Sequence, residues 1–203
     1  SEDRHNWPRD SNGNVLACMD YHSIEDVTFT TNNNNINNRG TMQGNGHVWW
    51  GAIQYLLHAE DRPRLFHIRQ SKNVLFEKIR LINSPYWTFW AENCDGLEVR
   101  YSEIDVRRDQ SDKHSYFDLT AFNTDGYDFS GNNVHVHDVS IWNDDDCIAV
   151  KGNSSNMLFE RINASGLGLV IGSIGNNQIV KNITFRDSYM YKTVKGIYLK
   201  TRW

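Results

Sequence analysis

The stretch "NNVHVHDVSIWN" (132–143) begins with a polar turn pair and continues with apolar residues at alternate positions. Val134 and Val136 alternate with histidines, and a further apolar residue follows three positions on, at Val139. Alternation of this kind predicts a β-strand and not a helix. Four other segments repeat the pattern: "KNVLFEKIRLIN" (72–83), "DGLEVRYSEIDV" (95–106), "SNMLFERINASG" (155–166) and "KNITFRDSYMYK" (181–192).

The spacing of these copies indicates a solenoid. The second residue of each turn pair falls at 73, 96, 133, 156 and 182, so the steps are 23, 37, 23 and 26 residues. A weaker copy, "EDVTFT" from Glu25, precedes the first by 47 residues, roughly two such steps. One short group of strands per repeat, with no helical pattern between them, predicts an all-β fold, the parallel β-helix. A β-sandwich is the main alternative, but it favours two-residue turns and a less regular spacing.

The 37-residue step predicts one rung that carries an extra loop of about 14 residues before Asp125. Arg107, Arg108 and "DKH" (112–114) border or occupy this loop. Their positive charges either line a cleft and attract an acidic polymer or face solvent, and the sequence leaves both possibilities open.

Length and composition limit the class of protein. The 203 residues suit one β-helix domain, 1–203, and 39% hydrophobic content indicates a packed core. The net charge is −4 and no basic cluster alternates with aromatics, so we expect no nucleic-acid partner. No run of 18 apolar residues occurs, so we expect no membrane span.

The chain ends suggest part of a longer solenoid. The sequence starts at Ser1 without a methionine and stops at "GIYLKTRW", in the middle of an expected strand. Because a terminal rung exposes unpaired backbone, we expect a mature or partial chain, a central portion of a β-helix whose ends are otherwise covered. Self-assembly through the solenoid ends is the corresponding partner hypothesis.

Three glycosylation triplets favour a secreted, extracellular protein. Asn153, Asn163 and Asn182 each begin an Asn-x-Ser/Thr sequence. The three cysteines, Cys18, Cys94 and Cys147, leave at least one unpaired if all disulfides are internal, so they say little about the compartment.

Four aspartates form the candidate site. Asp125 stands 20 residues before Asp145, in the run Asp144, Asp145 and Asp146. Because 20 residues is close to one rung, we expect Asp125 to lie beside Asp145 and Asp146 on the neighbouring rung. Glycoside hydrolysis needs one protonated acid and one carboxylate, and mutual repulsion raises the pKa of one of them.

Two other interpretations fit the aspartate run. Several carboxylates could hold calcium, although the EF-hand spacing is absent. The run could equally form a solvated turn. Neither interpretation depends on the 20-residue spacing between Asp125 and Asp145.

Other chemistry-bearing residues have plainer interpretations. His135 and His137 share the outward face of a strand, and with no further ligands evident we expect surface histidines and no metal. Cys147, inside an apolar strand, predicts a buried thiol. The aromatics of "WW" (49–50) and "PYWTFW" (85–90) could stack on sugars, but their place in the repeats favours packing at rung corners.

At the acidic residues the sequence resembles the polygalacturonase family of pectin-cleaving glycoside hydrolases. The family motifs Asn-Thr-Asp-Gly, Gln/Asn-Asp-Asp-Cys, Gly-His-Gly and Arg-Ile-Lys correspond in order to "NTDG" (123–126), "DDDC" (144–147), "GLG" (166–168) and "YLK" (198–200). Upstream, "RGTMQGNGHVWW" (39–50) and residues 62–90 are similar to the family's earlier rungs. The resemblance covers most of 25–203 and implies a right-handed parallel β-helix of the pectin-lyase type, with the family's terminal rungs absent.

The resemblance implies a role for each matching residue. Asp145 corresponds to the general acid, while Asp125 and Asp146 hold and activate the attacking water. Lys200 corresponds to a residue that binds a sugar carboxylate, and Asn123 and Tyr198 are further candidates for substrate contact. The family inverts the anomeric centre, which implies carboxyl groups about 6.5–9.5 Å apart. It needs no cofactor.

Two positions depart from the family pattern. Leu167 replaces the histidine of Gly-His-Gly, and Tyr198 replaces the arginine that grips the uronate carboxylate. We therefore expect a secreted cell-wall glycosidase that acts on a uronic-acid-containing pectic polysaccharide, with a substrate shifted from plain polygalacturonate. The competing hypothesis is a catalytically altered β-helix that serves as a structural or carbohydrate-binding extracellular component.

Overall fold

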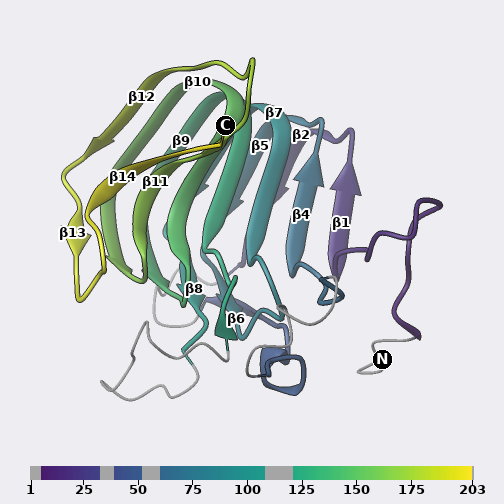
Figure 1. Ribbon diagram of the computed structural model, residues 1–203. Helices are drawn as coiled ribbons and strands as arrows, with labels where there is room; N and C mark the ends of the chain where they lie inside the picture. Colours follow the sequence, from purple (N-terminus) through teal and green to yellow (C-terminus); the bar gives the residue numbers. More distant parts are fainter. Residues whose placement is uncertain (1–5, 33–38, 52–59, 108–120, 203) are drawn as a thin grey trace.

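The chain folds as a parallel β-helix (Figure 1). This computed structural model describes residues 6–32, 39–51, 60–107 and 121–202. Within these ranges the strand-to-strand pairings are parallel, apart from an isolated antiparallel bridge between Arg9 and Val15. No helix in the described ranges is both long enough and apolar enough to span a membrane.

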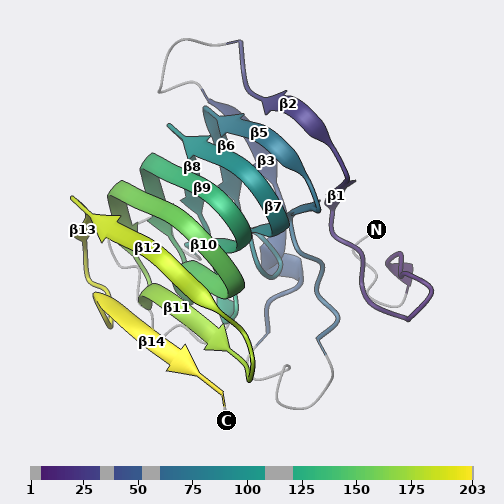
Figure 2. The same ribbon diagram turned by 90° about the horizontal axis from the view of Figure 1, so that it is seen from above.

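Three stacks of strands form the walls of the helix, and the chain passes through them in turn on each rung (Figures 1 and 2). Three long strands bend round a corner and contribute to more than one stack: β7 (Phe89–Arg100), β9 (Tyr127–Trp142) and β10 (Asp146–Ser165). The first wall, which we call sheet A, consists of the start of each long strand together with β1 (Met19–His22), β4 (Phe66–Arg69), β11 (Gly168–Ile174) and β14 (Ile197–Thr201).

The other two walls are built in the same way. Sheet B consists of the next part of each long strand with β2 (Glu25–Phe29), β5 (Lys72–Glu77) and β12 (Val180–Arg186). Sheet C consists of the ends of β9 and β10 with β3 (Gly40–Gln43), β6 (Ile79–Ile82), β8 (Glu103–Asp105) and β13 (Tyr189–Met190). A short 3-10 turn, η3 (Gly46–Val48), follows β3.

The register between rungs confirms the repeat read from the sequence. In sheet B the first apolar residue of each copy pairs with its counterpart on the next rung, in the order Val74, Leu97, Val134, Met157 and Ile183. The residues two positions later pair in the same way. The 3.6-residue helical period is absent because every rung satisfies its backbone from the rungs above and below, not from within itself.

The turn pair at the start of each copy has a conformational cause. Its second residue has a positive φ in every copy: Asn73 (49°), Gly96 (76°), Asn133 (57°), Asn156 (55°) and Asn182 (55°). Glycine and asparagine tolerate this left-handed region best, which explains their recurrence there. The asparagines also bond to one another along the stack.

The side-chain ladder runs across the rungs at this corner. Asn133 Nδ2 donates to Asp95 Oδ1 at 2.6 Å, and Asn182 Nδ2 donates to Asn156 Oδ1 at 3.1 Å. Asn156 Nδ2 in turn approaches Asn133 Oδ1 at 3.4 Å. The corner therefore holds adjacent rungs in register with side chains as well as backbone.

Stacked aromatic residues fill the interior between the walls. Phe66 lies 5.3 Å from Phe89 between ring centroids, and Phe159 lies 4.9 Å from Phe185. Phe66, Phe89 and Phe159 are fully buried. Burial of one such side chain stabilises the fold by about 1.5–3 kcal/mol, so the apolar alternation supplies most of the driving force.

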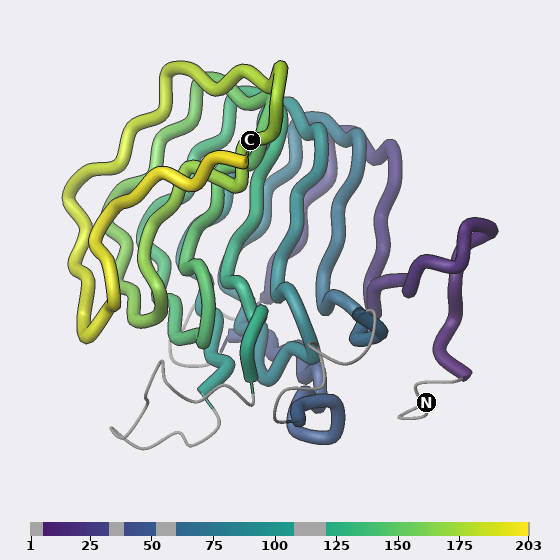
Figure 3. The backbone as a smooth tube through the Cα atoms, viewed as in Figure 1, coloured from purple at the N-terminus to yellow at the C-terminus, as the bar shows by residue number. Residues whose placement is uncertain are grey.

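The step of 47 residues proved to be one rung and not two. Val27 of β2 pairs directly with Val74 of β5, so the extra residues are insertions within a single rung, much of them between β3 and β4 (Figure 3). Counting residues cannot separate an extra rung from an insertion. The extra residues of the 37-residue step lie between β8 and β9, and there 108–120, with Arg108 and "DKH", fall outside the described residues.

The asparagine corner yields a stability prediction. Asn133→Ala places an ordinary side chain at φ 57° and removes the hydrogen bond to Asp95, so we expect unfolding free energy to fall by about 1–3 kcal/mol in urea denaturation. Asn133→Gly keeps the conformation accessible and loses only the side-chain contact. Equal losses for the two variants would mean that backbone conformation does not explain the asparagine.

Candidate active site

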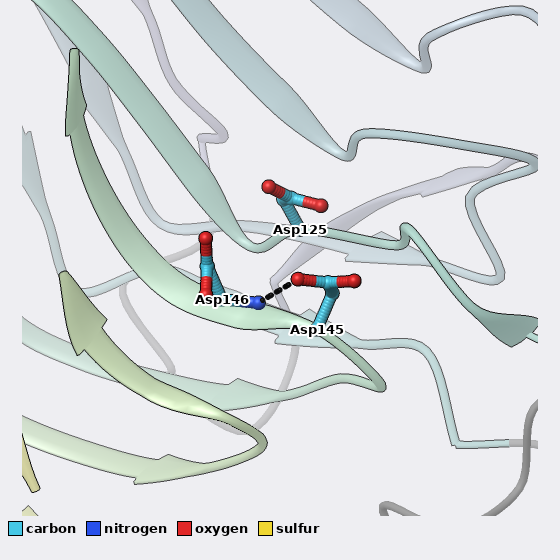
Figure 4. A group of neighbouring side chains, drawn as sticks. All are labelled: Asp125, Asp145 and Asp146. Carbon is cyan, nitrogen blue, oxygen red and sulfur yellow. Dashed lines mark hydrogen bonds between the residues drawn. The ribbon is translucent and has the colours of Figure 1, made fainter. Parts of the chain in front are cut away.

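Three carboxyl groups from two adjacent rungs meet on the outer surface of sheet A. Asp125 ends the turn before β9, whereas Asp145 and Asp146 lie where β10 begins. Tyr127 pairs with Ile148, and the backbone N–H of Gly126 donates to the Asp146 carbonyl at 2.8 Å. One carboxyl oxygen from each aspartate lies within 4.8 Å of the others, which confirms their expected proximity (Figure 4).

A buried asparagine and threonine hold the two turns together. Asn143 Nδ2 donates to the carbonyl oxygens of Thr124, Asp145 and Asp146 at 2.9–3.0 Å. The Thr124 hydroxyl donates to the Ala121 carbonyl at 2.7 Å and accepts from the Asp144 N–H at 3.3 Å. These side chains explain why the Asn-Thr-Asp and Asp-run motifs extend beyond the carboxyl groups themselves.

Glycine at position 126 is required by the close approach of the rungs. A Cβ there would collide with the Cys147 carbonyl oxygen and the Ile141 side chain. Gly126, the glycine of "NTDG", therefore allows the turn that carries Asp125 to pack closely against the rung that carries Asp146.

The aspartate run is buried, so the interpretation as a solvated turn is wrong. Asp125 is 4% exposed, Asp145 5% and Asp146 1%. Burial, and then the charge of Asp146, raise the pKa of Asp145 to about 6. Burial also raises the pKa of Asp125 well above its usual range, reinforced by the neighbouring charges of Asp128 and Asp145. Both carboxyl groups are thus easier to protonate than ordinary aspartates.

Two residues of β14, the polar Tyr198 and the cationic Lys200, contact Asp146. Tyr198 and Lys200 pair with Val170 and Gly172 of β11, and so share the outer face of sheet A. The Tyr198 hydroxyl donates to Asp146 Oδ1, and Lys200 Nζ lies 3.6 Å from Asp146 Oδ2. Burial, and then this hydrogen bond, raise the pKa of the Tyr198 phenol, so it stays a donor.

A cleft of about 550 Å³ opens over Asp125 and Asp145. This is a size typical of small-molecule and sugar sites. Asp146 lies behind it, covered by Tyr198. The cleft is lined by aromatic, cationic and polar side chains, among them Tyr86, Trp87, Phe122, Asn123, Lys151, Leu167, Gln178, Lys200 and Arg202.

Several cleft residues were missed or only partly anticipated by the sequence analysis. Lys151 and Arg202 were not singled out, although each continues the outward alternation of its strand, from Ala149 and from Lys200. Trp49 is buried as the packing interpretation expects, but Tyr86 and Trp87 line the cleft. The alternation of outward-facing residues along the strands next to the aspartates was the signal that could have identified Lys151 and Arg202.

The residues that depart from the family pattern also lie here. The Leu167 backbone N–H donates to the Asp145 carbonyl at 2.8 Å, a contact that any residue at 167 could make, and its side chain faces the cleft. Asn123 has a positive φ of 59°, and its N–H donates to Asp145 Oδ2 at 3.3 Å. Asn123 thus contacts the candidate acid directly.

The trio has the oxygen donors that a hard cation prefers, but its surroundings are cationic already. Lys200 faces Asp146, and Lys151 Nζ lies 3.9 Å from Asp125 Oδ2. Two ammonium groups this close would repel a divalent ion. That the site takes no metal and no cofactor remains a prediction.

The remaining sequence candidates lie away from the cleft. His135 and His137 face outward on sheet B and contact Glu160 and Glu98. Cys147 is fully buried, as expected, and burial raises the pKa of its thiol; none of the three cysteines forms a disulfide. Of the glycosylation triplets, Asn153, Asn163 and Asn182 are all exposed.

Comparison with known families identifies the chain. Residues 13–203 match the family described as glycosyl hydrolases family 28. The chain belongs to this family. Among curated family relatives, the exopolygalacturonase of Cochliobolus carbonum is 32% identical over 176 residues, 82% of this chain and 37% of that protein. The rhamnogalacturonase B of Aspergillus niger is 32% identical over 167 residues, 80% of this chain and 26% of that protein.

Solved structures agree on the fold. The endo-xylogalacturonan hydrolase of Aspergillus tubingensis superposes with a TM-score of 0.80 at 23% identity, covering 99% of this chain and 51% of that chain. Endopolygalacturonase I of Stereum purpureum gives 0.70 at 23% identity, covering 93% and 61%. These solved structures are parallel β-helices. This chain spans well under two thirds of the length of the curated relatives.

The electrostatics of Asp145 yield a prediction about stability and pH. The pKa of Asp145 is about 6 in the folded protein and near 3.8 when unfolded, so the folded state binds the proton more tightly. The stabilisation of the folded state by this tighter proton binding at Asp145 is fully present below pH 3.8 and is lost as the pH rises through about 6. Asp145→Asn removes this dependence.

We therefore expect the unfolding free energy of Asp145→Asn, relative to wild type, to increase by about 3 kcal/mol between pH 3.5 and pH 8. Urea denaturation at a series of pH values measures it. Asp187→Asn, at a side chain 71% exposed, controls for the loss of one carboxyl group. A difference that shrinks as the pH rises would contradict the raised pKa.

Proposed function

We propose that this protein hydrolyses glycosidic bonds in a uronic-acid-containing pectic polysaccharide. The observation that carries the proposal is the meeting of three buried carboxyl groups, with oxygens within 4.8 Å, beside a cleft that Lys151, Lys200 and Arg202 also line. Family membership supports the reaction type, and the family relatives named as exopolygalacturonase and rhamnogalacturonase support the pectic class.

Asp145 is suited to act as the general acid. It faces the cleft, and its pKa of about 6 keeps it protonated in mildly acidic solution. Its proton passes to the glycosidic oxygen as the bond from that oxygen to the anomeric carbon breaks. Asp146, behind it, supplies the negative charge that holds the proton on Asp145.

Asp125 is suited to act as the base. It lines the same cleft from the neighbouring rung, where it can take a proton from water as the water oxygen bonds to the anomeric carbon. Asp146 is held by Tyr198 and Lys200 and lies behind the cleft surface. Its contribution to water activation is therefore indirect, through Asp145.

Inversion of the anomeric centre rests on the family resemblance. The nearest carboxyl oxygens lie within 4.8 Å, closer than the roughly 6.5–9.5 Å typical of inverting pairs, so the spacing adds no support. Proton NMR of the first-formed reducing end distinguishes the outcomes. Product with the anomeric configuration opposite to that of the cleaved linkage supports inversion, and the same configuration contradicts it.

Lys200 and Arg202 are suited to bind the sugar carboxylate. Both line the cleft from successive outward positions of the β14 segment. The family arginine is replaced by Tyr198, whose hydroxyl serves Asp146, so a guanidinium is available at Arg202 instead. Trp87 offers an aromatic face for a sugar ring in the same cleft.

Extracellular secretion and glycosylation are part of the proposal. Asn163 lies exposed on sheet C, away from the asparagine corner, and is a suitable acceptor. Asn182 Nδ2, by contrast, donates to Asn156 within the ladder. Mass spectrometry of protein secreted from a eukaryotic host identifies the occupied sites.

The acids yield the first activity prediction. We expect Asp145→Asn and Asp125→Asn to reduce kcat by roughly 10²–10⁴-fold because each removes one proton-transfer group. Reducing-sugar release from polygalacturonate, xylogalacturonan and rhamnogalacturonan measures it. Asp187→Asn, an exposed aspartate outside the cleft, is the matched control and should retain wild-type rates.

If wild type cuts none of these polymers but binds them, the protein is a carbohydrate-binding component and the hydrolase proposal fails. If it cuts them and Asp145→Asn cuts equally well, the assignment of the acid fails.

The cations yield a second prediction. Lys200→Met and Arg202→Met should each raise KM for polygalacturonate, roughly tenfold for Lys200, because a charge-assisted contact is lost. Neither should change KM for the fully methyl-esterified polymer, which has no carboxylate to bind. Arg186→Met, on sheet B away from the cleft, is the control, and an equal effect on both polymers would contradict carboxylate binding.

A further inference from the structure

An ion pair between the buried Asp128 and the partly exposed Lys151 lies beside the candidate catalytic carboxyl groups. Asp128, on the outward face of β9, is fully buried, and Lys151 Nζ lies 2.6 Å from its Oδ1. The same ammonium lies 3.9 Å from Asp125 Oδ2 and 4.5 Å from the centroid of the Trp87 ring. The lysine is thus fixed on three sides, beside the candidate base.

The position of Lys151 follows from the rung register. Asp128 pairs with Ala149, and Lys151 is two residues further along β10, on the same outward face. A lysine there crosses the face of sheet A between Asp128 and Asp125. Arg64 also lies over the Trp87 ring, 4.8 Å from its centroid.

We propose that Lys151 is a positioning residue that, anchored by Asp128 and Trp87, holds the Asp125 carboxyl in place and favours its ionised form, the form that acts as the base. This inference rests on the proposed hydrolysis and adds a residue to it. Without a nearby cation, the buried Asp125 would take up the proton that it must remove from water. With Lys151 present, Asp125 is suited to accept a proton from water while the neighbouring Asp145 donates one to the glycosidic oxygen.

The charges around Asp125 support this division. Burial, Asp128, Asp145 and Asp146 all favour its neutral form and together raise its pKa well above the usual range, whereas Lys151 opposes them and favours the ionised form. Burial alone would lower the pKa of Lys151, but Asp128 and Asp125 outweigh it and raise that pKa, so the ammonium stays charged. The charge on which Asp125 depends is therefore permanent over the working pH range.

Other groups face this cluster from each element packed against it. Tyr86 approaches Asp125 from the segment before β7, and burial raises the pKa of that phenol, so it is neutral. From β14, Tyr198 and Lys200 approach Asp146. The titratable and charged neighbours are Asp128, Asp145, Asp146, Lys151, Tyr86, Arg64, Tyr198 and Lys200.

The test uses two substitutions with opposite effects on Asp125. Lys151→Met removes the cation, so the acidic limb of the kcat/KM–pH profile, where the base must ionise, should move up by about one pH unit. Asp128→Asn removes a repelling charge and leaves Lys151 with Asp125 as its nearest carboxylate, so the same limb should move down. Lys151→Arg keeps the charge and should keep the limb in place.

The alkaline limb is an internal reference. It reports Asp145, whose pKa is raised chiefly by burial and by the charge of Asp146. It should move much less than the acidic limb in these variants. If Lys151→Met fails to fold because Asp128 is left unpaired, the double variant Lys151→Met with Asp128→Asn removes both charges, and its limb should fall between those of the single variants.

A substrate-free readout separates this inference from the proposed function. Carbon-13 NMR of the Asp125 carboxyl, assigned with Asp125→Asn, should show the same opposite movements without any polymer. If wild type hydrolyses nothing but the carboxyl shifts move oppositely, the hydrolase proposal fails and the role of Lys151 stands. Loss of activity with both limbs unmoved, or a rise in KM alone, would make Lys151 a structural or substrate-binding residue and overturn the inference.

Discussion

Parallel backbone pairing between successive rungs is the constraint on which this structure depends. Because β9 and β10 pair at Tyr127 and Ile148, a 21-residue offset brings Asp125 next to Asp146. In sheet B the offset is 23, at Val134 and Met157, and the irregularity after Val150 absorbs the difference. The carboxyl groups are therefore placed by the hydrogen-bonded scaffold itself, which makes their spacing rigid.

The cluster of buried carboxyl groups on sheet A is electrostatically unfavourable for the fold. Buried carboxyl groups normally destabilise a fold unless charges or hydrogen bonds compensate them. Here Lys151 pairs with Asp128, and Tyr198 and Lys200 serve Asp146. Asp125 and Asp145, which face the cleft, keep raised pKa values. Such incomplete compensation is typical of sites where proton transfer occurs.

The departures from the family pattern gain a physical meaning in this setting. Tyr198 does not leave a gap where the family has arginine, because its hydroxyl donates to Asp146. The positive charge at this edge of the cleft comes instead from Lys200 and Arg202. The Leu167 backbone N–H donates to the Asp145 carbonyl, and its apolar side chain lines the cleft. Both residues contribute side chains around the three aspartates, whose arrangement is set by the pairing of the rungs.

Residue patterns along the chain are enough to predict the β-helix, the spacing of its regular rungs, and the meeting of Asp125 with Asp145 and Asp146. Strand alternation and the glycine or asparagine of each turn are local properties that repeat with the rung, so counting residues was enough. Residue counting could not distinguish one rung with an insertion from two rungs, because both give a step of 47 residues. The burial of the aspartates, and the cleft that Trp87 and Arg202 line, became evident in the folded structure. It alone decided the contacts of Lys151 and Tyr198. Those contacts depend on which side chains face one another across neighbouring rungs. The residue pattern within one rung does not predict which side chains of the next rung lie within contact distance.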